Sequence, residues 1–272
     1  MKIDKHQGDQ LANRWEKVGK DAVRIQEKLA TGKRLNRASD DAAGMAVAKE
    51  FEKQIREYRN ASENIAAGMS ALAIADGGSG AINDMLQRQR ELAIQSASGT
   101  LGPDQRQAID KEFQALSQEI ERTSRSSSYN GQNLLDGSSR LSDGTGRIQA
   151  GDGEGVELSG ANLSLSSLNM GSIRVDTLDG ALQALGSIDA AMSQVHESRA
   201  SRGSLSNRLE FALSNLGSQM IHTSEARSRI EDLDMAQGMT EKVRNDILRE
   251  TNAAALSQFN QLSRSHLVAL FQ

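Results

Sequence analysis

Few residues in this chain could do chemistry, and the first of them are two adjacent carboxylates, Asp40 and Asp41. Two carboxylates serve as general acid and base only when both reach the same substrate. Adjacent side chains on a helix point about 100° apart, so this pair would not converge. We expect it instead to begin or cap a helix, because the positive end of the helix dipole favours acidic side chains.

Two further segments resemble ligand loops only in composition. The glycines from Asp76 to Gly80 lack the lysine and the Ser/Thr that a phosphate-binding loop places after its glycines. Asp152 and Glu154 lie among glycines, but the alternating ligands and the closing glutamate of a calcium loop are missing. We expect a helix at the first segment and a solvated turn at the second.

The four histidines, His6, His196, His222 and His266, are far apart and form no His-Glu-x-x-His arrangement. The chain has no cysteine, which excludes disulfides, thiolate metal sites and thiol catalysis. No segment combines a nucleophile, a base and an orienting group. The sequence therefore predicts neither an enzyme nor a cofactor.

Composition narrows the possible partners and fold classes of the protein. The formal net charge of -4 over 272 residues favours neither nucleic acid nor an anionic membrane as a partner. Aromatic residues make up 3% of the chain, which suits a rod better than one thick globular core. The first residues do not read as a secretory signal peptide, and we expect no membrane-spanning run of about 18 apolar residues.

The elements that position these residues are helical at both ends. Steps of three and four separate the apolar residues of the first helix, which are Leu11, Trp15, Val18, Ala22, Ile25 and Leu29. This spacing is typical of a coiled-coil seam. Gly32 should end that helix, and a second helix is expected from Asp40 towards Ser98, with Ser39 as its cap. The glycines at 77, 78 and 80 predict a kink in that helix.

Pro103 predicts a reversal into a third helix, from about Gln105 to Arg125. The chain then becomes glycine-rich, and the alternation of Val156 with Leu158 and of Leu163 with Leu165 predicts small hairpins. Helical periodicity resumes from Thr177 to about Ile230, with a break expected near Gly203. The last segment has Met235, Met239, Val243 and Ile247 at steps of four, followed by a leucine-rich stretch.

The terminal helices need a partner. Isolated helices are marginal in water, so the apolar faces stabilise them only where another surface covers them. Two paired helices still expose apolar edges, which further copies of the chain would cover. We expect termini that are disordered in the monomer and fold on assembly.

Three segments carry a specific pattern. The first begins at the end of the first helix and comprises Leu29, Thr31, Gly32, Arg34, Leu35, Asn36, Ala38, Asp40, Asp41, Ala42, Ala43, Gly44, Ala46, Val47 and Ala48. The second comprises Leu86, Gln87, Arg88, Arg90, Glu91, Leu92, Ala93, Gln95, Ala97, Tyr129, Asn130, Gly131 and Leu134. The third comprises Gly203, Asn207, Arg208, Leu209, Ser228, Arg229, Ile230, Asp232, Asp234 and Ala236. In order and spacing these segments resemble bacterial flagellin, within terminal regions that make up about four fifths of the chain.

This resemblance implies a mostly α fold: a long antiparallel helical rod or coiled-coil hairpin, with a small outward-facing β-hairpin insert, assembled as a helical polymer. The implied parts are an N-terminal core helix (1–38), two halves of a helical rod domain (39–135 and 177–232), the insert (136–176) and a C-terminal core helix (233–272). The insert is very short for the family.

The resemblance also implies function: a structural subunit, secreted through the flagellar type III channel, that polymerises into the extracellular filament for motility. The expected polymerisation interface comprises Leu11, Trp15, Val18, Ile25, Leu29, Val243, Ile247, Leu256, Phe259, Leu267 and Leu270. The expected partners are copies of itself or other flagellins, the hook-associated junction and cap proteins, and an export chaperone at the C-terminal segment. In the family, Arg88, Leu92 and Glu112 correspond to a contact with a Toll-like receptor of the host.

Two alternatives stay open at the level of sequence. A hook-filament junction protein has similar ends, although the Ser228–Ala236 match and the short insert favour the filament subunit. A secreted coiled-coil binding module, such as an adaptor or effector, would show the same helical periodicity. Loss of filaments without loss of partner binding, after about 35 residues are removed from each end, would favour that module.

Overall fold

A computed structural model describes residues 5–138, 146–149, 155–157 and 161–270. The chain divides into two compact units. We call the first, Met1–Ile55 with Ile221–Gln272, the terminal unit, and the second, Arg56–Met220, the central unit. Each unit is described by itself.

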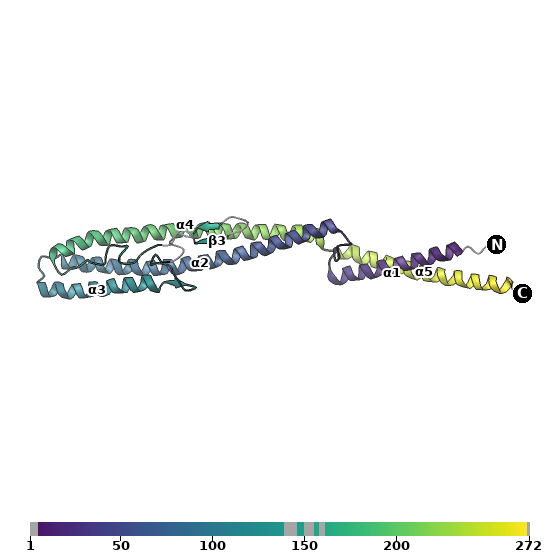
Figure 1. The fold of residues 1–272 in the computed structure, drawn as a ribbon, viewed down its shortest axis with the longest axis horizontal. Helices are drawn as coiled ribbons and strands as arrows, with labels where there is room; N and C mark the ends of the chain where they lie inside the picture. The colour runs from purple at the N-terminus through teal and green to yellow at the C-terminus, as the bar shows by residue number, and fades with distance from the viewer. Residues whose placement is uncertain (1–4, 139–145, 150–154, 158–160, 271–272) are drawn as a thin grey trace. The chain divides into compact units, whose positions relative to one another are not determined.

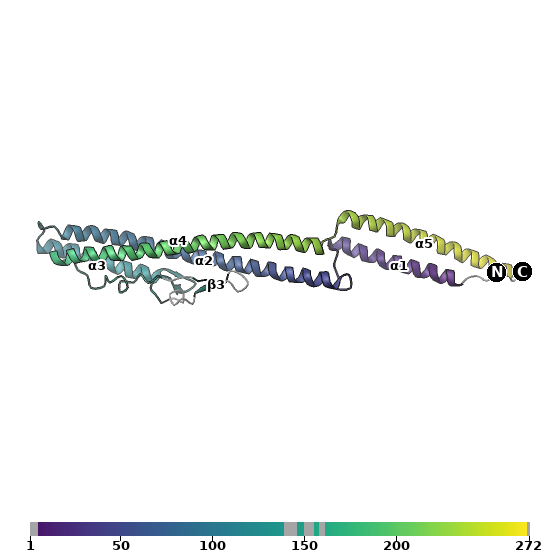
Figure 2. The same ribbon diagram turned by 90° about the horizontal axis from the view of Figure 1, so that it is seen from above.

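The terminal unit is built on a pair of helices, α1 (Lys5–Thr31) and α5 (Met235–Leu270), which lie side by side and antiparallel (Figures 1 and 2). On α1 the predicted seam is confirmed as the less exposed face except at Trp15, which is 42% exposed: Ile25 is buried, and Leu11, Val18, Ala22 and Leu29 are partly buried. Gly32 ends α1 with a φ of +68°, a left-handed conformation that favours glycine at a helix C-terminus.

Helix α2 (Ala42–Ser96) begins in the terminal unit, one turn after the predicted cap. Ser39 does not cap it; the Oδ1 atom of Asp41 accepts a hydrogen bond from the backbone N–H of Gly44 at 2.9 Å. The first backbone N–H groups of a helix have no partner within the helix, and this carboxylate accepts a hydrogen bond from one of them. The neighbouring Asp40 instead binds the linker before the helix.

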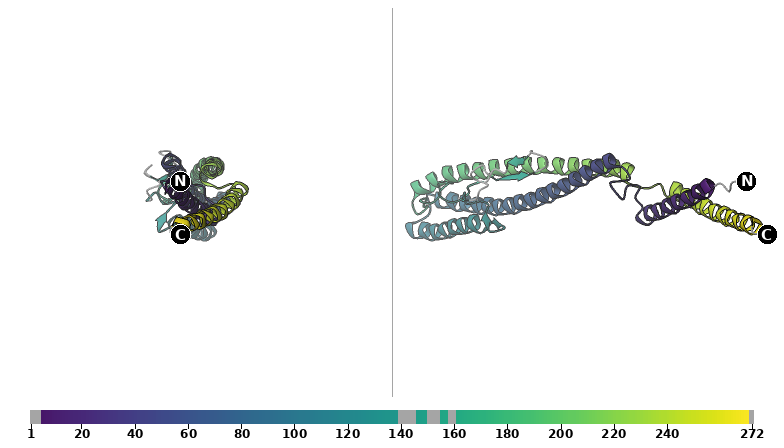
Figure 3. Two further views of the ribbon diagram at one scale, coloured as in Figure 1. Left: turned by 90° about the vertical axis from the view of Figure 1, so that its right-hand side faces the viewer. Right: turned by 45° about the vertical axis from the view of Figure 1, so that its right-hand side comes forward.

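The central unit packs three helices side by side: the larger part of α2, α3 (Pro103–Ser126) and most of α4 (Leu178–Glu231) (Figures 1 and 3). Steps of three, four or seven separate the buried residues of α4, which are Ala181, Ala184, Ile188, Ala191, Val195, Arg202, Leu205, Leu209 and Leu216. That spacing is the knobs-into-holes pattern of a coiled coil. Phe113 and Ile120 of α3 complete the core and are fully buried.

The break predicted near Gly203 is wrong, because α4 runs through that residue. Helix α2 likewise stays helical through Gly77, Gly78 and Gly80, so the kink predicted there does not interrupt the helix. Packing accounts for one of these glycines: a Cβ on Gly78 would lie 2.4 Å from the Oγ atom of Ser127 and 2.9 Å from a methyl carbon of Leu135. A glycine lowers helix propensity by about 1 kcal/mol, which burial of the rest of a long helix readily outweighs.

Two short antiparallel pairs follow α3. Strands β1 (Ser128–Tyr129) and β2 (Gln132–Asn133) are joined by Asn130 and Gly131, both at positive φ, as a tight hairpin turn requires. Strands β3 (Arg147–Gln149) and β4 (Gly155–Glu157) pair Ile148 with Val156. Both side chains pack on a second hydrophobic cluster between α2 and α4, which comprises Ala61, Ile65, Leu72, Leu205, Leu209 and Leu216. The hairpin predicted around Val156 is confirmed; Leu158 lies outside the described residues.

The hairpin predicted around Leu163 and Leu165 is wrong. Leu163 donates its backbone N–H to the carbonyl oxygen of Leu135 at 2.7 Å, and residues 165–169 form turns. Both leucines pack on the core of the central unit, together with Leu168, Met170 and Val175. The alternation therefore reflects burial of a turn-rich segment and not the two faces of a strand.

By length and composition alone, α2 is apolar enough to cross a membrane, contrary to the expectation from the sequence. Its apolar side chains have another role in this structure: Ile65, Ile82 and Leu86 are fully buried in the central unit. The core helix of a folded domain meets the same compositional criterion.

Candidate functional site

The end of α1 and the start of α5 are tied together by two linkers, residues 32–41 and 232–234. Their backbones pair directly: Leu233 donates its N–H to the carbonyl oxygen of Gly32 at 2.9 Å, and Arg34 donates to that of Glu231 at 2.7 Å. Lys33 and Asp232 form an antiparallel bridge. We call residues 32–41 with 227–234 the linker clasp.

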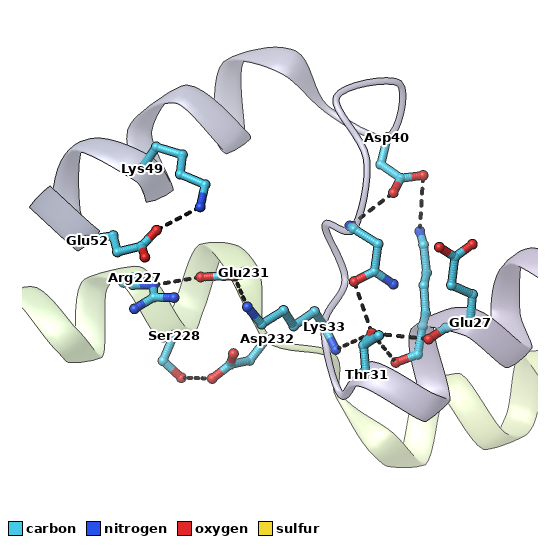
Figure 4. Close-up of polar contacts among 12 residues, drawn as sticks. Glu27, Thr31, Lys33, Asp40, Lys49, Glu52, Arg227, Ser228, Glu231 and Asp232 are labelled. Atoms are coloured by element: carbon cyan, nitrogen blue, oxygen red, sulfur yellow. Dashed lines mark hydrogen bonds and ion pairs between the residues drawn. The ribbon is translucent and has the colours of Figure 1, made fainter.

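Glu231 is the centre of the charged contacts in the clasp (Figure 4). Its carboxylate lies 2.5 Å from the Nζ atom of Lys33 and 2.6 Å from the Nε atom of Arg227. Partial burial raises the pKa of this carboxyl, but the hydrogen bonds from Arg227 and Lys33 together outweigh it and hold the pKa below its ordinary value. The clasp therefore depends on an ionised Glu231.

Asp40 folds the first linker onto itself. Its Oδ2 atom accepts hydrogen bonds from the backbone N–H groups of Asn36 and Arg37, each at 3.1 Å. Burial raises the pKa of Asp40, and these backbone donors, with the charges of Lys28 and Arg24, lower it to a net value below the ordinary one. The clasp fixes where α1 ends and α5 begins, so it positions every interface residue predicted on these two helices.

The predicted interface residues divide into two groups. Those that hold the pair together are Ile25, which is 4% exposed, and the partly buried Leu11, Val18, Leu29, Leu256 and Phe259. Those that point to solvent are Trp15, Val243 and Ile247, which are 42%, 52% and 58% exposed. The side chains of Leu267 and Leu270 lie outside the described residues.

The exposed group is larger than the set predicted from the sequence. Met235 and Met239 are each 50% exposed and continue the row of Val243 and Ile247 along α5. We call these four residues the apolar row. On α1, Val23 is 66% exposed and was missed because it lies outside the seam periodicity; its signal is an apolar residue on the outer face of an amphipathic helix.

The three residues associated with receptor recognition do not share one surface. Arg88 donates hydrogen bonds from its Nε and Nη2 atoms to Glu112 at 3.1 and 2.8 Å, and both side chains are about half exposed. Leu92 is 2% exposed and belongs to the core of the central unit. The Leu92 side chain is therefore not on the surface of the central unit, and the receptor contact of these three residues stays a prediction.

The residues first considered for chemistry have structural surroundings. Asp40 and Asp41 bind backbone N–H groups, and Asp76 pairs with Arg199 of α4 at 2.8 Å. His196 and His222 are exposed, and the side chains of the other two histidines lie outside the described part, as do Asp152 and Glu154. Among the described residues, no group of three or more His, Asp or Glu side chains could hold a metal ion.

Comparisons with known proteins agree with this arrangement at both ends of the chain. Residues 10–140 match the family model of the bacterial flagellin N-terminal helical region, and residues 185–271 match that of the C-terminal helical region. A flagellin of Halalkalibacterium halodurans is 37% identical over 244 residues, covering 90% of each chain.

Two solved structures are also similar. The crystal structure of a Bacillus cereus flagellin is 28% identical with a TM-score of 0.50, covering 57% of this chain and 88% of that one. A candidate flagellar hook-associated protein from Vibrio parahaemolyticus is 15% identical with a TM-score of 0.60, covering 71% and 100%, which shows a shared fold alone. The chain belongs to the bacterial flagellin family, whose members are structural subunits of the flagellar filament.

Proposed function

We propose that this chain polymerises through its terminal unit, and one observation carries the proposal. Helix α5 packs on α1 along one face and exposes a second apolar face, where Val243 and Ile247 are each more than half exposed. An isolated soluble helix pair gains nothing from such a row. Neighbouring copies in a filament would cover it.

The free energy gained by covering the apolar row fits contacts in a polymer better than a single pairwise contact. Full burial of an aliphatic side chain contributes about 1.5 to 3 kcal/mol, and the four residues of the apolar row are already about half buried. Covering them would therefore contribute several kcal/mol, which is comparable with the roughly 4 to 15 kcal/mol lost when two bodies associate. Contacts with several neighbours at once would exceed that loss.

The predicted interface then has two roles. Ile25, with the partly buried residues of both helices, would stabilise the α1–α5 pair, and Trp15, Val243 and Ile247 would contact other copies. We extend the second role to Leu267 and Leu270 because they continue the leucine-rich stretch of α5. The division of the chain at residues 38, 135, 176 and 232 into core, rod and insert is part of the same proposal.

The finer biology is proposed on the family alone. The chain would leave the cell by the flagellar type III route and join the extracellular filament, alone or with other flagellins. Hook-associated junction and cap proteins would contact the two ends of that filament. An export chaperone would hold the C-terminal segment beforehand, and Arg88 with Glu112 would be the exposed part of a host receptor contact. The proposed function is structural and includes no catalytic activity.

A double variant, Val243→Glu with Ile247→Glu, tests the proposal. It should leave the helical circular dichroism of the monomer nearly unchanged and reduce sedimentable filament at least tenfold, because charges would enter the covered face. Val243→Leu is the matched control and should polymerise as the unchanged protein does. Filaments of normal yield from the double variant would overturn the proposal.

A further inference from the structure

A groove of about 520 Å³ lies along α1 in the terminal unit. Its apolar lining comes from Trp15 and Val23, which are 42% and 66% exposed. Gly19 lies one turn from each, and a Cβ at that position would meet nothing within 4 Å. No side chain at position 19 therefore separates the two apolar residues, which lie on one face of α1 at steps of four and form an apolar strip. We call this feature the Trp15 groove.

The rim of the Trp15 groove carries two arginines without a close anionic partner. Arg24 and Arg249 make no hydrogen bond or ion pair with the residues that the structure describes, and Arg24 acts on Asp40 only at longer range. The other three cations of the lining have acidic partners: Lys20 pairs with Glu16 at 2.7 Å, Arg37 with Glu27 at 2.9 Å, and Lys28 with Asp40 at 3.9 Å. The groove thus combines an apolar strip with two guanidinium groups open to an acidic ligand.

The apolar row has the complementary pattern. Val243 and Ile247 lie on the face of α5 away from Leu256, and Glu250 follows Ile247 by three residues and so shares their face. Within the described part of the chain Glu250 has neither a hydrogen bond nor an ion pair. The row therefore ends in an unneutralised carboxylate, as the groove ends in unneutralised guanidinium groups.

We propose that the Trp15 groove of one copy receives the apolar row of α5 from the next copy, with Glu250 set against Arg24 and Arg249. The inference rests on the proposed function and names the contact within it. Apolar shape and opposite charge both favour this occupant.

The two surfaces are different parts of one chain, so the contact is heterologous. A self-complementary contact closes into a dimer, whereas a groove-to-row contact leaves one groove and one row free at the ends of every complex. Such a contact repeats without limit when its rotation does not close. This geometry accounts for an open helical filament rather than a closed oligomer.

Cross-linking between copies tests the contact. Because the chain has no native cysteine, only the introduced cysteines can react. A Val23→Cys chain and a Val243→Cys chain are mixed, polymerised and treated with a short bismaleimide; neither chain can cross-link internally. The mixture should give the mixed dimer at least tenfold above a control mixture in which Val47→Cys, 44% exposed on α2, replaces Val23→Cys. Filaments without the mixed dimer would overturn the inference.

Charge reversal gives a second test at low salt, where ionic contacts are least screened. Arg24→Glu alone would set a like charge against Glu250 at every contact, although Arg249 stays opposite it, and Glu250→Arg alone would set a like charge against both arginines. Each variant should raise the critical concentration roughly three- to tenfold. In an equal mixture the two chains can alternate, so that residues 24 and 250 carry opposite charges at every contact, and the mixture should assemble at a lower critical concentration than either variant alone. A mixture no better than either variant would overturn the inference.

The two levels of proposal fail in distinguishable ways. If the Val243/Ile247 double variant forms filaments, polymerisation through this face fails, and the groove contact fails with it. If that variant cannot assemble but no mixed cross-link forms in filaments of the cysteine chains, the face polymerises by another partner surface. Only the Trp15 groove assignment is then wrong.

Discussion

At the scale of single residues, glycine spacing alone does not say which glycines matter. Gly77, Gly78 and Gly80 look alike in the sequence, yet only Gly78 lies against other side chains, those of Ser127 and Leu135. A Cβ on Gly77 or Gly80 would meet nothing within 4 Å. The distinction depends on a segment about 50 residues further along the chain, so no local pattern could predict it.

Gly78→Ala should destabilise the protein by about 1 to 3 kcal/mol, because the added methyl group would crowd the side chains of Ser127 and Leu135 at a partly buried site. Gly77→Ala and Gly80→Ala should each stabilise by up to about 1 kcal/mol, since alanine is the better helix former. Chemical denaturation followed by circular dichroism measures all three. Equal effects of the three substitutions would contradict this packing of α2 on the segment after α3.

Arg202 is a second residue that the sequence pattern did not single out. It occupies a core position of α4, is 4% exposed, and donates a hydrogen bond from its Nη2 atom to the Oγ atom of Ser79 at 2.5 Å. Burial lowers the pKa of Arg202, and its Nε atom has no hydrogen-bond partner among the described residues. A charged group in an apolar seam without a bound carboxylate is costly.

Arg202→Leu should therefore raise the melting temperature, by an amount corresponding to about 1 to 3 kcal/mol, because an apolar side chain suits the seam. Arg199→Leu is the control: it removes the partly exposed pair with Asp76 and should change stability by less than about 1 kcal/mol. Thermal unfolding followed by circular dichroism measures the melting temperatures of both variants and of the unchanged protein. A clear loss of stability in Arg202→Leu would show that this arginine is adequately solvated.

At the scale of elements, the sequence was most informative where one local signal controls a helix end. Gly32 ends α1 and Pro103 begins α3, since positive φ and fixed φ are local properties. The predicted break at Gly203 and the hairpin around Leu163 were wrong because tertiary packing decided both. The linker clasp was also beyond local reasoning, since it joins residues nearly 200 positions apart.

The clasp should be sensitive to acid. The pKa of Glu231 is lowered in the folded chain, so its stabilisation is fully present above the ordinary value of 4.5 and is lost as the pH falls through the folded value below it. Glu231→Gln should therefore be less stable than the unchanged protein at pH 7, by about 1 kcal/mol, and this difference should be smaller at a pH well below 4.5.

Denaturation at both pH values measures that difference. Glu225→Gln is the control, because the Glu225 carboxylate is 59% exposed, and it should show little effect at either pH. A Glu231→Gln deficit that stays constant or grows in acid would contradict an ionised Glu231 in the clasp.

At the scale of the whole molecule, the two units differ in how much core they contain. Both hydrophobic clusters among the described residues belong to the central unit, whereas the buried apolar side chains described in the terminal unit are Ile25, Leu35 and Ala48. The sequence predicts termini that are disordered in the monomer and fold on assembly; this stays a prediction, and a small core is what a weakly stable unit would have.

Hydrogen exchange of the monomer should therefore be uneven. Amides of α1 and α5 should exchange at least tenfold faster than those of α3 and of the parts of α2 and α4 in the central unit. The reason is that local opening of the α1–α5 pair exposes little buried surface. Mass spectrometry of peptides from each helix measures this directly. Equal protection along the chain would mean that the terminal pair is stable without other copies.

The central claim is that other copies cover the exposed apolar face of the terminal unit, and Trp15, the only tryptophan, reports on it directly. Its fluorescence should be measured before and after polymerisation, with acrylamide as quencher. We predict that emission shifts to shorter wavelength and that quenching falls at least threefold in the filament. Filaments in which Trp15 stays as accessible to acrylamide as in the monomer would contradict the account.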